Sequence, residues 1–159
     1  MANKVSYLGI MTALACIMSY IEFLLPFSVG IYGVKLGLAN LVIVSMLYLA
    51  NARQALLVSV VRVLLVSLLF ANFAVFLYSM SGAAVSLLVM TVAKKKECFS
   101  IMMVSILGGI SHNLAQLFVA YLLLEQLIVW NYFPVLLVSG IITGGLIGYL
   151  TDRIKRALK

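Results

Sequence analysis

Residues 5 to 25 read VSYLGIMTALACIMSYIEFLL, an almost uninterrupted apolar stretch whose one charged residue is Glu22. A helix that crosses the hydrocarbon core of a membrane needs about 20 residues of this kind. A signal peptide has a shorter apolar region that is followed by a cleavage site, and this stretch fits neither requirement. We therefore predict that it stays in the protein as the first membrane-spanning helix.

The rest of the chain continues the same pattern. Its 159 residues are 65% hydrophobic and 9% charged, with a mean hydropathy of +1.23. A soluble domain cannot hide that much apolar surface in one core, so lipid is the expected solvent. The sequence therefore predicts an all-α integral membrane protein, a single domain over residues 1–159 that forms a bundle of six transmembrane helices. The predicted spans are 5–25, 36–49, 55–70, 76–93, 99–124 and 134–150.

The basic residues lie mostly in the breaks between these spans, and their distribution predicts the orientation. With the N-terminus in the cytoplasm, nine of the 11 lysines and arginines face the cytoplasm, Lys35 alone faces outward, and Arg62 lies within a span. An excess of Lys and Arg marks the cytoplasmic side. We therefore expect both termini inside a bacterial plasma membrane, with Trp130, Tyr132 and Phe133 as an aromatic anchor at the outer interface. The cytoplasmic set is Lys4, Arg53, Lys94, Lys95, Lys96, Arg153, Lys155, Arg156 and Lys159.

Two polar blocks interrupt the apolar spans. Residues 33–41 read GVKLGLANL and residues 109–116 read GISHNLAQ. Polar groups at membrane depth are costly and usually functional. His112 and Gln116 are four residues apart, so they can share one face of a helix. The alternative is that such residues only hold helices together, at about 0.6 kcal/mol for each hydrogen bond. Their common placement in the outer half of the bundle favours a binding pocket.

Arg62 is the most informative single residue, because an arginine at the centre of a span costs about 2.5 to 3.5 kcal/mol and needs a partner. The structural explanation is an ion pair with Glu22 or a hydrogen bond to carbonyls at a helix end. The functional one is a counter-ion for an anionic ligand, to which Lys35 at the start of the second span would add its charge. The candidate substrate-binding residues are Glu22, Lys35, Asn40, Arg62, His112, Asn113 and Gln116.

Small residues predict close contacts between helices. Gly140, Gly144 and Gly148 repeat at four-residue intervals in the sixth span, a spacing that lets helix backbones approach each other inside a bundle. Gly9 and Ala13 repeat that spacing in the first span, where a docking surface for another membrane subunit is an equally open interpretation. With one histidine and scattered acids, the sequence predicts no metal site, no catalytic residues and no cofactor.

Together, the spans and polar blocks carry a family resemblance over nearly the whole chain. The matching stretches are Ser19 to Glu22 with Pro26, Gly33 to Asn40, Val61 to Leu64, and His112-Asn113 with Gln116. They resemble the Gx transporter family, also labelled heptaprenyl diphosphate synthase component I, which is distantly similar to the substrate-binding S components of energy-coupling-factor (ECF) transporters.

The resemblance implies a six-helix fold that captures a small molecule from the extracellular side, and the cations Arg62 and Lys35 favour an anionic one. Transport would then be driven by a transmembrane T subunit and two cytosolic ATPases, which fits the absence of a GxxxxGK[ST] nucleotide loop from this sequence. S components commonly dock the T subunit through Ala-x-x-x-Ala on the first helix. Here the stretch from Gly9 to Ala13 keeps small residues but departs from that pattern.

The synthase label implies a different function, in which the chain is a membrane accessory subunit for the synthesis or handling of polyprenyl diphosphates or quinone lipids. Prenyl synthases bind diphosphate through magnesium held by aspartate-rich motifs, whereas Asp152 is the one aspartate of this chain. We therefore expect that the chain is not itself an enzyme. A purely structural subunit is a third possibility, and it would not require the polar residues to converge.

Overall fold

The computed structural model describes residues 2–24, 37–70 and 72–158. These residues form six α-helices and one short 3-10 helix, and they contain no strand. Five of the helices are long and apolar enough to cross a membrane, which confirms the predicted all-α membrane bundle and makes the chain a multi-pass membrane protein. The elements are α1 (Ala2–Leu24), α2 (Leu38–Leu49), α3 (Ala52–Phe70), α4 (Phe73–Lys95), α5 (Ile101–Leu124), η1 (Leu127–Tyr132) and α6 (Phe133–Ala157).

Side chains at the breaks between spans start several of the helices. Asn51, Asn72 and Ser100 each accept a hydrogen bond from the backbone N–H three residues further on, at 2.9, 3.0 and 3.2 Å. These bonds cap the first turns of α3, α4 and α5. Pro134 lies in the first turn of α6, where the missing N–H costs nothing. The apolar runs therefore end where local polar residues can satisfy the helix ends.

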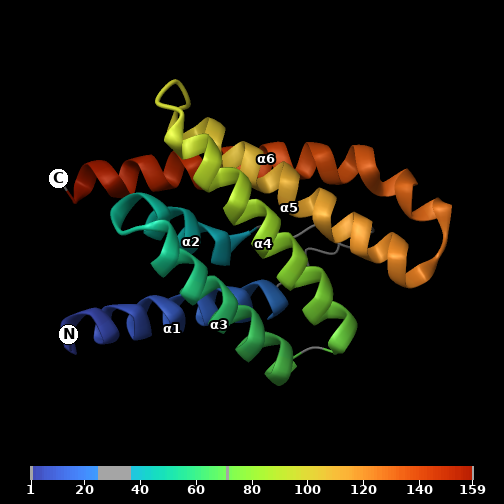
Figure 1. Cartoon of the computed structure of the whole chain (residues 1–159), viewed down its shortest axis with the longest axis horizontal. Helices are drawn as coiled ribbons and strands as arrows, with labels where there is room; N and C mark the ends of the chain where they lie inside the picture. The colour runs from blue at the N-terminus through green and yellow to red at the C-terminus, as the bar shows by residue number, and fades with distance from the viewer. Residues whose placement is uncertain (1, 25–36, 71, 159) are drawn as a thin grey trace.

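The helix α2 is the main departure from the predicted architecture. Its 12 residues give a length of about 18 Å, whereas a hydrocarbon core is about 30 Å thick. The predicted span at 36–49 is therefore a helix too short to cross on its own. It packs inside the bundle against α1, α3 and α6, as Figure 1 shows. Its N-terminus consequently lies within the protein at membrane depth. Its buried residues are Ala39, Val42, Ile43, Val44, Met46 and Leu47.

The glycines of α6 place its backbone directly against that of α5. A β-carbon added to Gly140 would lie 3.0 Å from the backbone of Gly109, and one added to Gly144 would lie 2.8 Å from the Cα of Ile106. A β-carbon on Gly148 would approach the backbone of α5 to 2.6 Å. The predicted role of these glycines in packing within the bundle is confirmed. Together with Gly109 they form what we call the glycine seam.

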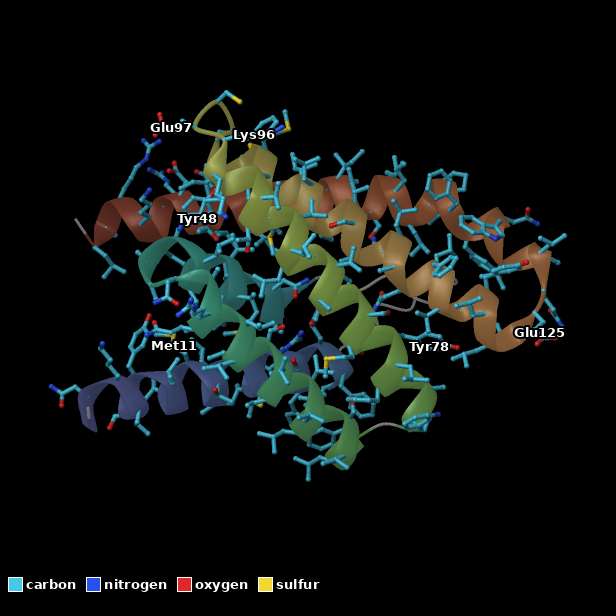
Figure 2. The ribbon with its side chains drawn as sticks, viewed as in Figure 1. Met11, Tyr48, Tyr78, Lys96, Glu97 and Glu125 are labelled. Carbon is cyan, nitrogen blue, oxygen red and sulfur yellow. The ribbon has the colours of Figure 1, made fainter. Side chains whose placement is uncertain are left out.

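Both termini lie at the same end of the bundle (Figure 1). Figure 2 shows Lys96 and Glu97 at that end and Glu125 at the opposite end. The helix α6 also runs on to Ala157, past the predicted boundary at 150, and carries basic residues in its last turn. The described basic residues in the last turns of α4 and α6 thus lie toward one end of the bundle, the pattern that the positive-inside rule predicts for a cytoplasmic face.

This topology predicts one-sided labelling of Cys98, which is exposed in the turn between α4 and α5. In a Cys16→Ser background, a membrane-impermeant maleimide added to intact cells should leave Cys98 unmodified until the membrane is opened. A Trp130→Cys variant that lacks both native cysteines should react from outside, because Trp130 lies in η1 at the opposite end. Equal labelling of both positions from outside would refute the orientation.

Candidate substrate-binding site

A cavity of about 420 Å³ lies among the six α-helices, and each of them contributes to its wall. This volume is in the range of small-molecule binding sites, about 300 to 1,000 Å³. All the candidate residues that the structure describes line it, whereas Lys35 lies outside the described residues. Polar residues that are far apart in sequence therefore converge. They are Glu22, Asn40, Arg62, His112, Asn113 and Gln116.

Arg62 lies near the middle of α3 and supplies the positive charge of the described part of the wall. Its Nη1 donates a hydrogen bond of 3.3 Å to Oγ of Ser19, which itself donates to the carbonyl of Ala15 at 3.0 Å. Its Nε is buried and has no hydrogen-bond partner among the described residues. A guanidinium carries five N–H donors, and one of them is used for Ser19, so Arg62 retains donors for a further acceptor.

Glu22 does not form the ion pair with Arg62 that the sequence suggested as one alternative. Within residues 2–24, 37–70 and 72–158, no carboxylate oxygen lies within 4.0 Å of a nitrogen of Arg62. Glu22 attracts the arginine only at longer range, and its Oε1 accepts a hydrogen bond from the backbone N–H of Gly37. Gly37 directly precedes α2 and has a left-handed backbone conformation, with φ of 75°. The carboxylate of Glu22 therefore caps the start of α2.

His112 and Gln116 lie on one face of α5, as their spacing predicts, and they pack against α4 at Gly82. A β-carbon on Gly82 would lie 2.8 Å from Cε1 of His112 and 3.0 Å from Cγ of Gln116. Only a residue without a side chain leaves room for both. Gly82 therefore positions these two side chains at the cavity wall.

Gly82→Ala should displace His112 and Gln116 and weaken ligand binding. Crowding of this kind costs about 1 to 3 kcal/mol, so we expect the amount of ligand that co-purifies with the protein to fall about tenfold. Thermal stability should change less, because alanine is a better helix former than glycine by about 1 kcal/mol, which offsets part of the crowding. Gly9→Ala is the control, since a β-carbon there has no described atom within 4 Å. Equal ligand retention in the two variants would contradict the positioning role.

Asn113 contributes to the scaffold. Its Nδ2 donates a hydrogen bond of 2.7 Å to the carbonyl of Leu136, which ties α5 to α6. The side chains of Asn40 and Gln116, in contrast, make no hydrogen bond to any other described residue. The predicted set thus divides into groups already bonded within the protein and groups that face the cavity with free donors and acceptors.

Several lining residues were not predicted from the sequence. They include the buried serines Ser67, Ser86 and Ser105, together with Thr143 and Met90. Ser86 donates a 2.9 Å hydrogen bond to the carbonyl of Gly108, so it also links α4 to α5. Met90 and Ser105 lie within about two turns of the ends of α4 and α5 on the side of the termini. The cavity therefore extends deeper than the outer half in which the sequence placed it. The sequence signal that could have predicted this deeper extent of the cavity is the presence of serines in the middle of the spans.

The fold and the cavity define an integral membrane protein with an internal cavity that is lined in part by polar side chains. The family model described as heptaprenyl diphosphate synthase component I matches residues 11–154. The chain belongs to this family. Searches of curated proteins and of solved structures found no match.

Proposed function

We propose that this protein is a membrane-embedded substrate-binding subunit that captures a small anionic molecule from the extracellular side, in the manner of the S component of an ECF transporter. The observation that carries the proposal is the cavity itself, in which the guanidinium of Arg62 has unused donors at membrane depth. A carboxylate or phosphate would neutralise that charge and accept its hydrogen bonds. The free amides of Asn40 and Gln116 would bind further polar groups of the ligand.

A binding subunit of this kind needs partners to release its ligand inside the cell. The chain contains no nucleotide-binding loop, so the energy would come from a T subunit and ATPase subunits. The surface proposed for docking is the face of α1 around Gly9 and Ala13, both of which are exposed. Ile10 and Ile17, on the same helix, are also exposed. This arrangement leaves a shallow apolar surface that a membrane helix can approach closely.

We also propose that the chain performs no catalysis. Its single aspartate, Asp152, forms an ion pair with Arg156 at 2.7 Å near the end of α6, away from the cavity wall. The described residues contain no group of three or more His, Cys, Asp or Glu side chains that could hold a metal ion. This distribution does not suit the magnesium chemistry of a prenyl synthase.

The family description supports a second candidate function, as a membrane accessory subunit that handles polyprenyl diphosphates or quinone lipids. Arg62 would then bind the diphosphate. The cavity holds about 420 Å³, so a long prenyl tail would have to leave it and lie in the lipid. The same description implies a partner synthase component, which a test of this function must include.

The two functions can be distinguished by mass spectrometry of the molecules that co-purify with the detergent-solubilised protein. The proposed function predicts a small polar anion that a wash with geranyl diphosphate does not displace. Recovery of polyprenyl lipids, or displacement by geranyl diphosphate, would favour the second function. Uptake of the identified molecule into liposomes that contain this chain alone would contradict the need for partner subunits.

A further inference from the structure

Two lysines meet across an aromatic ring at the end of the bundle where the termini lie. The Nζ atoms of Lys94 and Lys155 lie 5.0 and 5.4 Å from the centroid of the Tyr48 ring. The three residues come from α4, α6 and α2, and all are half-buried. Figure 2 shows Tyr48 on the side of the bundle that carries Lys96. The two ammonium groups are close enough to repel each other.

No carboxylate of the described chain neutralises this pair. Asp152 is three residues before Lys155, but it pairs with Arg156 at 2.7 Å. Glu97 is exposed in the turn after α4. Among the described residues, neither lysine has a carboxylate oxygen within 4.0 Å. Charges that are partly removed from water are usually paired, so this cluster lacks an anion.

The lysines retain donors for such an anion. Lys94 uses one N–H for the carbonyl of Leu47, in the last turn of α2, and an ammonium has three. Lys155 makes no hydrogen bond to another described side chain or carbonyl. The ring of Tyr48 attracts both cations and holds them on one site. The geometry therefore supplies two fixed positive charges with several free N–H groups between α4 and α6.

We propose that Lys94 and Lys155 bind a phosphate group at the cytoplasmic face of the membrane. Both residues lie near the cytoplasmic ends of their helices, at the depth where anionic headgroups meet basic side chains. The phosphate can belong to an anionic lipid of the inner leaflet or to a soluble phosphate compound. This site is separate from the cavity, whose lining includes neither lysine.

The test compares Lys155→Gln with Lys95→Gln in the purified full-length protein. Lys95 is the matched control, because it is an exposed lysine at the end of α4 and its replacement removes the same charge. Native mass spectrometry after exchange into micelles that contain phosphatidylglycerol measures the bound lipid. We expect Lys155→Gln to retain about fivefold less phosphatidylglycerol than wild type, and Lys95→Gln to match wild type.

A second measurement identifies the source of the phosphate. It again uses Lys155→Gln, because replacing Lys94 would also remove the hydrogen bond to the carbonyl of Leu47. Thermal unfolding is followed with inorganic phosphate in lipid-free detergent, and separately with phosphatidylglycerol. Stabilisation of wild type but not of Lys155→Gln by phosphate alone assigns a soluble compound, and stabilisation only by phosphatidylglycerol assigns a lipid. The proposal is overturned if Lys155→Gln and Lys95→Gln retain equal lipid and neither anion distinguishes wild type from Lys155→Gln.

Discussion

Arg62→Gln is expected to abolish ligand retention while leaving the bundle folded. The guanidinium is the cation of the described cavity wall, and removing one partner of a buried charged contact costs at least about 2 kcal/mol, or about 30-fold in affinity. Stability should be unchanged or higher, because no ion pair with Glu22 is broken and a charge at membrane depth is removed. Mass spectrometry of the co-purified molecule and thermal unfolding measure the two effects.

Arg53→Gln is the matched control, since Arg53 is exposed in the first turn of the same helix. It should retain the ligand. The double variant Arg62→Gln with Glu22→Gln separates binding from scaffolding. Three results together would show that Arg62 has a structural role and does not bind the ligand. The single Arg62 variant would be unstable, the double variant would recover stability, and ligand retention would be the same in wild type and both variants.

Gly144→Ala should give a large loss of stability, because the glycine seam leaves no room for a methyl group there. The new β-carbon would lie 2.8 Å from the Cα of Ile106 and equally close to the carbonyl oxygen of Ser105, and backbone atoms cannot move aside as a side chain can. Overpacking of this kind costs about 1 to 3 kcal/mol. Thermal unfolding in detergent measures the effect.

Gly145→Ala provides the comparison within the same turn. A β-carbon at Gly145 would contact the end of the Met102 side chain at 3.5 Å, an ordinary van der Waals distance. Its stability should match wild type or exceed it slightly, because alanine is the better helix former. If Gly144→Ala proves as stable as Gly145→Ala, the contact between α5 and α6 is looser than the glycine seam requires.

The sequence was sufficient to predict the class of the protein and most of its helices. Long apolar runs admit only helices in lipid, and residues such as Asn72 and Ser100 mark where they begin. The sequence also predicted the extent of α2, at 36–49 against the observed Leu38–Leu49, but not how its start is held. The left-handed backbone of Gly37 and its bond to Glu22 fix the first turn inside the bundle. Hydropathy carries no signal for such a tertiary contact.

The sequence predicted which polar residues share the site better than it predicted what each one does. Arg62 and Gln116 line the cavity with free donors, as a binding role requires. Asn113 also lines it, yet its amide is bonded to the carbonyl of Leu136, a contact between helices that residue types do not reveal. Lys35 lies outside the described residues and stays a prediction. Buried serines were missed because a single hydroxyl hardly alters the hydropathy of a span.

The glycine seam has a consequence for the motions that would let a ligand enter or leave. Where two backbones touch without side chains between them, sliding one past the other brings peptide groups into collision, so α5 and α6 should move as one unit. Within the described residues, α1 has no extensive contact with α4, α5 or α6, and the first three helices meet the others mainly through α2 with α6 and α3 with α4. We therefore expect the cavity to open by movement of α1, α2 and α3, the group of helices that also carries Arg62.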